Sequence, residues 1–354
     1  MPPEQNSTNH TDPVLQGIKD RSESYLSTIY ALHGFIHAVK QNSSQQKNSV
    51  FSSIGRRMHF ASGHNKRDLC TPDLVVQLDT SKGIVGEAKL LVCQNVDDHW
   101  NKYIKQLKKY DADLIGWWTI DEKIENTSLA WITELSFSAQ ISEYFQTKID
   151  SGEVKFQHPF AIIEFSKHQK AREFLFLRTR MGSMPSSMEK VFRDGIDIAL
   201  ETLIVENREK KFYDAKPQDT EYIMEILWQN IFTQEAITNQ SGLVTYNPND
   251  KIWRIPVNLD TLTTTLQKLY GSVGAQNREV EYPQNSWIRD ALEKFVSIGF
   301  AEKGQADKEY VILFKRLSRP MEKFVNLIHK KKKKNLDDGK QLDLFSYSEE
   351  ELVQ

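Results

Sequence analysis

The sequence predicts an α/β protein in which a mixed β-sheet is flanked by helices and is followed by a mostly helical domain. Residues 74–92 contain two short apolar, β-rich stretches around a turn rich in Asp, Ser, Lys and Gly. Apolar residues recur at three- and four-residue spacing before this hairpin, in 14–40, and after it, in 97–110. Beyond residue 182 the periodicity becomes mainly helical, so we expect a second domain to begin there.

The composition is typical of a globular protein. The chain has 354 residues, 27% of them charged and 39% hydrophobic, which is enough for two or three domains with buried cores. The net charge of −2 means that a nucleic-acid surface would be a local basic patch. No apolar run long enough to span a membrane is present, and Cys70 and Cys93 lack metal-ligand spacing. We therefore expect a cytoplasmic protein without a membrane partner.

Composition shifts divide the chain into four regions. The N-terminus is polar, a Gly/Ser/Pro-rich break follows the last predicted strand of the first domain, and a lysine run precedes the acidic C-terminus. We expect a disordered N-terminus at 1–13, the sheet domain at 14–182, the helical domain at 183–325, and a flexible basic linker and tail at 326–354.

The hairpin carries residues suited to metal-assisted chemistry. A turn centred near Ser81 would place Asp73 roughly opposite Lys89, and Glu87 shares a strand face with Lys89. Asp73 and Glu87 could hold Mg²⁺ or Mn²⁺, while Lys89 could stabilise developing negative charge. The alternative is an ordinary ion pair at the edge of a sheet.

The spacing of these residues carries a family resemblance. Pro72–Asp73, thirteen further residues and then Glu87–Ala88–Lys89 resemble the signature of the PD-(D/E)XK nuclease superfamily. Gln106 and Tyr110 are similar to the QxxxY element of its RecB-like members, and Glu23 lies where many members have an acid on their first helix. The resemblance implies a restriction-endonuclease-like fold, metal binding by the acids including Glu23, and support of the site by Gln106 and Tyr110.

The helical domain contains a second pattern. Between residues 262 and 315 two helices are followed by a tight β-hairpin, with Arg289 and Lys294 on the polar face of the second helix. This order is typical of a winged helix that binds DNA. Contact with a protein partner, or packing on a neighbouring domain, is the alternative.

The tail contains a short apolar motif in polar surroundings. The motif is formed by Gln341, Leu342, Leu344 and Phe345, and it resembles the bacterial sliding-clamp-binding motif. The resemblance implies that a flexible segment tethers the protein to a clamp. A chance match in a solvated tail is the alternative.

Together these features predict a Mg²⁺-dependent DNA endonuclease that hydrolyses phosphodiester bonds in restriction, phage defence or DNA repair. Two alternatives stay open at this point. One is a non-catalytic DNA-binding winged-helix protein with a structural nuclease-like fold, and the other is an RNA nuclease.

Overall fold

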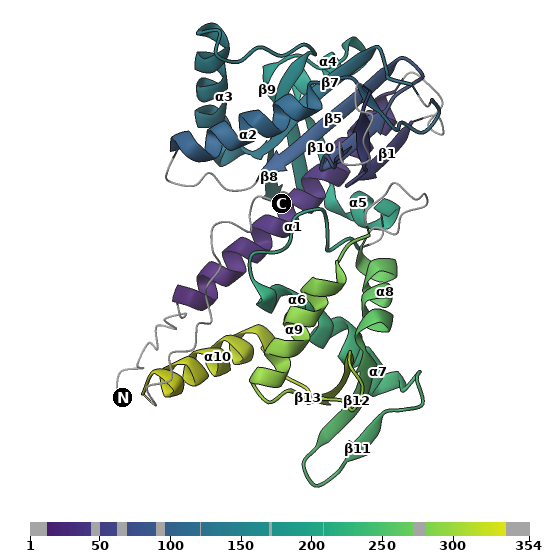
Figure 1. Cartoon of the computed structure of the whole chain (residues 1–354), viewed down its shortest axis with the longest axis vertical. Coiled ribbons are helices and arrows are strands. Elements are labelled where there is room, and N and C mark those ends of the chain that lie inside the picture. The colour runs from purple at the N-terminus through teal and green to yellow at the C-terminus, as the bar shows by residue number, and fades with distance from the viewer. Residues whose placement is uncertain are drawn as a thin grey trace, which may run out of the picture. The chain divides into compact units, whose positions relative to one another are not determined.

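The computed structural model describes two compact units (Figure 1). The sheet unit comprises Glu23–Lys216 and Thr264–Gln284, and the helical unit comprises the described residues of Met1–Ser22, Pro217–Thr263 and Asn285–Gln354. Within the described residues, no helix is both long enough and apolar enough to cross a membrane. The described residues are 13–43, 50–61, 69–89, 96–120, 122–169, 172–207, 209–271 and 281–337.

The sheet unit is built on a seven-stranded mixed sheet. The three middle strands are parallel, and the outer strands pair antiparallel. The predicted α/β class with a mixed sheet is therefore confirmed. In spatial order the strands are β1 (Phe51–Ile54), β4 (Leu74–Gln77), β5 (Lys82–Lys89), β7 (Asn126–Glu134), β8 (Phe160–Gln169), β9 (Glu173–Gly182) and β10 (Ile196–Ala199).

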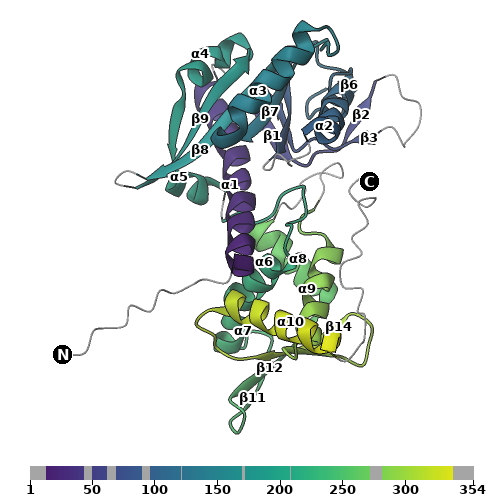
Figure 2. The same ribbon diagram turned by 90° about the vertical axis from the view of Figure 1, so that its left-hand side faces the viewer.

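Helices cover both faces of this sheet, which explains the apolar strands (Figure 2). Helices α2 (Val96–Tyr110) and α3 (Leu135–Asp150) cover one face, where Trp131 packs against Tyr103 and Phe145 at ring-centroid distances of 5.3 and 5.8 Å. Helix α1 (Pro13–Asn42) lies on the other face, where Phe35 stacks on Phe192. Helices α4 (Ser186–Asp194) and α5 (Leu200–Asn207) also belong to this unit.

Two predicted elements differ from the observed ones. The apolar stretch 114–120 favours a core strand, but only β6 (Leu114–Ile115) forms, in a small separate sheet with β2 (Met58–Phe60) and β3 (Leu69–Cys70). Gly116 has a φ of 106°, which turns the chain away from an extended path.

The second difference moves the predicted end of the sheet domain. Helical spacing of apolar residues in 186–204 favours one continuous helix, but Gly195, with a φ of 84°, ends α4. Ile196–Ala199 then pairs with β9 as the last strand of the sheet. The boundary expected near Gly182 consequently falls inside the sheet unit, which continues to Lys216.

The helical unit packs around Trp228. Its ring contacts the rings of Phe295, Phe300, Phe314 and Phe324 at centroid distances of 4.9 to 5.5 Å. The hairpin formed by Thr245–Asn247 and Ile252–Asn258 was not predicted, because its strands carry no clear alternation of apolar and polar residues. The elements are α6 (Thr220–Ile226), the π-helical turn 227–232, α7 (Thr233–Thr238), β11 (Thr245–Asn247), β12 (Ile252–Asn258), α8 (Leu259–Tyr270), α9 (Asn285–Ser297), β13 (Ala301–Lys303), β14 (Glu309–Phe314) and α10 (Pro320–Asp337), with strand order β11-β12-β14-β13.

Candidate active site

The β4–β5 hairpin brings the two predicted acids together. Leu74 pairs with Gly86, so Asp73 lies opposite Glu87 and not opposite Lys89 as expected. The turn is tighter than predicted, because Asp79 Oδ1 accepts hydrogen bonds from the backbone N–H and the hydroxyl of Ser81. Asp73 Oδ2 accepts the backbone N–H of Ala88 at 2.8 Å, which fixes this carboxylate at the end of the sheet.

Helix α2 supplies two donors to Glu87. Gln106 Nε2 donates to Glu87 Oε1 at 2.6 Å, and the Tyr110 hydroxyl donates to Oε2 at 2.9 Å. These two residues are four apart on the helix, so their side chains are adjacent, and Gln106 Nε2 also donates to the Tyr110 oxygen at 3.0 Å. Lys89 Nζ lies 2.5 Å from Glu87 Oε1. The structure thus gathers Asp73, Glu87, Lys89, Gln106 and Tyr110, which we call the carboxylate site.

Burial makes the carboxylate site electrostatically unusual. Burial first, and then the charge of Glu87, raise the pKa of Asp73 well above its ordinary value. Burial alone would lower the pKa of Lys89, but Glu87 and Asp73 outweigh it and raise that pKa, so the ammonium stays charged. Burial and the two acids raise the pKa of the Tyr110 phenol well above its ordinary value, so it remains a donor. When both acids are ionised, two carboxylates face one ammonium, and the excess of negative charge suits a hard divalent cation.

A loop outside the PD-(D/E)XK-like motif also lies near the carboxylate site. The backbone N–H of Tyr213 donates to the Tyr25 hydroxyl at 3.3 Å, and the two rings are 4.9 Å apart. Burial, followed by the charges of Asp73 and Glu87, raises the pKa of the Tyr213 phenol well above its ordinary value. The next residue, Asp214, accepts the Tyr282 hydroxyl and adds to the raised pKa of Asp73. Three polar residues, Tyr213, Asp214 and Tyr282, therefore belong to the surroundings of the acids.

Glu23 is not brought to the carboxylate site by the described contacts. It lies on an exposed part of α1, and its charge acts on Lys167. The charged side chains that act on Asp73 are those of Glu87, Lys89 and Asp214. Metal binding by Glu23 stays a prediction.

The donors available to a metal are the two acids of the hairpin. Among the described residues, no group of three or more His, Cys, Asp or Glu side chains is placed to hold a metal ion. Mg²⁺ keeps several waters and is commonly held by one or two carboxylates together with substrate phosphate. Asp73 and Glu87 fit this mode of binding, with water and substrate oxygens completing the coordination.

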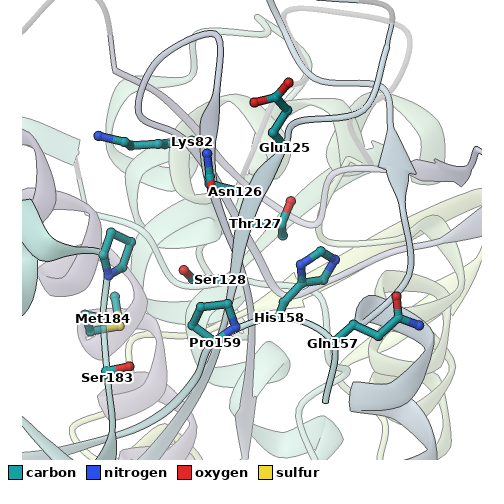
Figure 3. Close-up of a pocket in the computed structure, with 11 residues that line it drawn as sticks. Lys82, Glu125, Asn126, Thr127, Ser128, Gln157, His158, Pro159, Ser183 and Met184 are labelled. Carbon is teal, nitrogen blue, oxygen red and sulfur yellow. The ribbon is translucent and has the colours of Figure 1, made fainter.

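A separate polar pocket lies at the other end of β5 and β7 (Figure 3). It has a volume of about 400 Å³, and its lining includes Lys82, Thr127, Ser128, His158 and Ser183. The buried Nε2 atom of His158 has no hydrogen-bond partner among the described residues. Lys82 and Lys89 stand at opposite ends of β5, about 23 Å apart at about 3.3 Å per residue. This pocket is therefore distinct from the carboxylate site.

Comparison of the chain with protein-family models, with curated proteins and with solved structures gives no match. The functional argument accordingly rests on geometry and chemistry. The tail motif of Gln341, Leu342, Leu344 and Phe345 lies outside the described residues.

Proposed function

We propose that the chain is a Mg²⁺- or Mn²⁺-dependent nuclease of the PD-(D/E)XK type that hydrolyses phosphodiester bonds in DNA. The observation that carries the proposal is the convergence of Asp73, Glu87 and Lys89 at one end of a sheet, with two donors from α2 fixing Glu87. The order of elements supports a restriction-endonuclease-like core. Helix α1 precedes the antiparallel β4–β5 pair, and α2 connects β5 to the parallel strand β7.

The chain's own residues would hold and balance the metal. Asp73 and Glu87 are 3% and 1% exposed, so their mutual repulsion is weakly screened and a bound cation would relieve it. When bound, the metal would activate a water molecule and neutralise charge on the phosphate. The hydrogen bonds from Gln106 and Tyr110 keep the Glu87 carboxylate from rotating, which preorganises the site.

Lys89 is the residue best placed to act on the substrate. Its side chain is 27% exposed, in contrast to the buried acids beside it. Because its pKa lies above the ordinary value, it carries its charge at neutral pH. A permanent ammonium at this position would stabilise the negative charge that develops on a phosphoryl oxygen in the transition state.

The helical unit would bind the DNA outside the carboxylate site. Its order of β11–β12, α8, α9 and β13–β14 supports the winged-helix proposal. Lys294 is not free for DNA, because its Nζ lies 2.7 Å from Glu221 Oε1. Lys315 and Arg316, by contrast, are exposed after β14 and have no acidic partner among the described residues. We therefore assign phosphate contact to this end of the unit, and a sliding clamp as partner of the tail stays a prediction.

The test is a cleavage assay with the full-length chain. Supercoiled DNA, linear DNA and single-stranded RNA are incubated with Mg²⁺, with Mn²⁺ or with chelator, and products are resolved on gels. We expect metal-dependent DNA cleavage that falls about 10²- to 10³-fold in Lys89→Ala, which is typical of a lost charge-stabilising group. Lys82→Ala is the matched control, since it removes a lysine from the other end of the same strand.

The other outcomes of this assay would contradict the proposal or point to another function. Undiminished cleavage by Lys89→Ala or Asp73→Ala would refute the assignment of the carboxylate site. Preferential cutting of RNA would make the chain a ribonuclease. DNA binding with no cleavage under any metal would support a non-catalytic DNA-binding protein.

A further inference from the structure

A second pocket opens at the same sheet edge as Lys89, on the face that carries α1. It lies at the carboxyl ends of the parallel strands β7 and β8, the edge at which open α/β sheets bind ligands. Its volume is about 350 Å³, within the range of about 300–1,000 Å³ that is usual for ligand sites. It is lined by Ser27, Glu134, Leu135, Ser136, Phe165, Ser166 and Lys167, and we call it the edge pocket.

The edge pocket is adjacent to the carboxylate site along the backbone. Thr133 on β7 is the register partner of Lys89 on β5, and Glu134 follows Thr133. Neighbouring strands lie about 4.8 Å apart and consecutive Cα atoms 3.8 Å apart, so the backbones of Glu134 and Lys89 are roughly 6 Å apart. One strand of DNA rises about 3.4 Å per nucleotide. Lys89 and Thr133 share the face covered by α2, whereas Glu134 points to the face that carries α1, so a strand whose phosphate lies at Lys89 reaches the pocket by passing over the end of the sheet.

The polar side chains of the edge pocket form few hydrogen bonds within the fold. Glu134 precedes α3, yet its side chain makes no capping hydrogen bond. Glu134, Ser136, Ser166 and Lys167 have no hydrogen-bond or ion-pair partner among the described residues. Ser27 alone is occupied, because its hydroxyl donates to a carbonyl within α1. The pocket thus presents a carboxyl acceptor, an ammonium donor and two free hydroxyls.

Apolar surface surrounds these polar groups. Leu135, the first residue of α3, is 44% exposed, while Phe165 is buried beside it. The Lys167 ammonium lies 4.8 Å from the centroid of the Tyr30 ring. Desolvation lowers the pKa of Lys167, although nearby acids including Glu134 act to raise it. Burial raises the pKa of Glu134, although the charge of Lys167 acts to lower it. Both groups would therefore gain from a bound partner that offers hydrogen bonds.

We propose that the edge pocket takes up one unstacked nucleobase of the nucleic-acid substrate. The proposal rests on the proposed nuclease function and adds to it a determinant of sequence preference. Leu135 acts as an apolar wedge between bases, as apolar side chains do when they unstack a base step. Glu134 accepts from an exocyclic amino group, and Lys167 donates to a neighbouring carbonyl oxygen. Cytosine and guanine offer both groups, whereas thymine has no amino group, so cytosine or guanine is preferred.

The test measures base unstacking and cleavage separately, with the full-length chain. In chelator, where no cleavage occurs, the chain is titrated with oligonucleotides that carry 2-aminopurine at successive positions, because this base analogue brightens when it leaves the stack. We expect brightening at one position, within a few nucleotides of the bond cut in Mg²⁺. Leu135→Ala should remove the brightening, and Leu269→Ala, an equally exposed leucine on α8, should not.

Base preference is read from the cleavage rates of substrates that differ at that one position. The wild-type chain should prefer cytosine or guanine to thymine by about tenfold, a size typical of one good base contact. Glu134→Leu and Lys167→Leu remove the acceptor and the donor, and each should reduce this ratio toward one. The proposal is overturned if the chain binds and cuts DNA without brightening, or if the variants keep the wild-type preference, although the nuclease assignment then stands. If the chain binds and brightens without cutting in any metal, the nuclease assignment fails and base uptake stands. Absence of binding to any oligonucleotide overturns both.

Discussion

Replacement of Tyr110 by Phe isolates the hydrogen bonds that hold Glu87. Tyr110 is 2% exposed, and its hydroxyl donates to Glu87 Oε2 at 2.9 Å and accepts from Gln106 Nε2 at 3.0 Å. Phe preserves the packing of the ring but leaves a buried carboxylate oxygen without its donor. A hydrogen bond to a charged group contributes about 1.5–3 kcal/mol, so we expect the unfolding free energy to fall by about 2 kcal/mol.

The measurement must report on the sheet unit alone. Native-state hydrogen exchange of the amides of β5 and α2 does so, because it follows opening of the elements that carry the site. In a thermal scan the same loss corresponds to a shift of roughly 4–8 °C for a unit of this size. Tyr144→Phe is the matched control: its hydroxyl lies 3.5 Å from Asn101 Oδ1 at the surface, and we expect a change within about 0.5 kcal/mol.

A double-mutant cycle extends the test to the second donor. Gln106→Leu removes the other hydrogen bond to Glu87, and the two side chains also contact each other. The energies of neighbours that share a partner are not additive, and we expect a coupling of about 0.5–3 kcal/mol. A Tyr110→Phe variant as stable as Tyr144→Phe, or strict additivity with Gln106→Leu, would refute the view that Glu87 is held by a connected network.

Three further predictions concern charge. The raised pKa of Asp73 means that its proton stabilises the native state below the ordinary value near 3.9, and that this contribution is lost as pH rises through the native pKa. In chelator, the stability of Asp73→Asn relative to wild type should therefore increase as pH rises above about 3.9, and urea midpoints showing the opposite trend would contradict this. In the helical unit, Lys294→Ala should destabilise the fold by leaving Glu221 unpaired without changing the salt dependence of DNA affinity. Joint replacement of Lys315 and Arg316 by Gln should instead make the slope of log DNA affinity against log salt concentration less steep. The expected change corresponds to the loss of nearly two phosphate contacts, which a filter-binding titration would detect.

Local sequence patterns predicted the elements that carry the site. Turn residues between two apolar stretches were sufficient to predict the β4–β5 hairpin. The helical spacing of apolar residues in α2 predicted that Gln106 and Tyr110 lie side by side. The register was wrong by two residues, since it depends on the length of the turn, which is set by hydrogen bonds between Asp79 and Ser81.

Features that depend on tertiary contacts could not be predicted in this way. The stretch 191–204 has helical periodicity throughout, yet pairing with β9 makes Ile196–Ala199 a strand, because sheet context outweighs propensity. Tyr213, Asp214 and Tyr282 approach the site from distant parts of the chain. Each lies in a segment with no motif, so only the folded chain reveals their proximity.

The interleaving of the two units has a consequence for synthesis and for dissection of the protein. Residues Thr264–Gln284 complete the sheet unit, where Tyr282 bonds to Asp214, yet they follow much of the helical unit along the chain. The helical unit in turn uses Leu15 and Ile18, which pack against Met321 and Val325. On the ribosome, therefore, the nascent sheet unit stays incomplete until residue 284 has emerged, and a contiguous fragment cut at either boundary leaves each half without part of its core. Circular permutation or co-expression of complementary fragments, and not simple truncation, is the route to the separate halves.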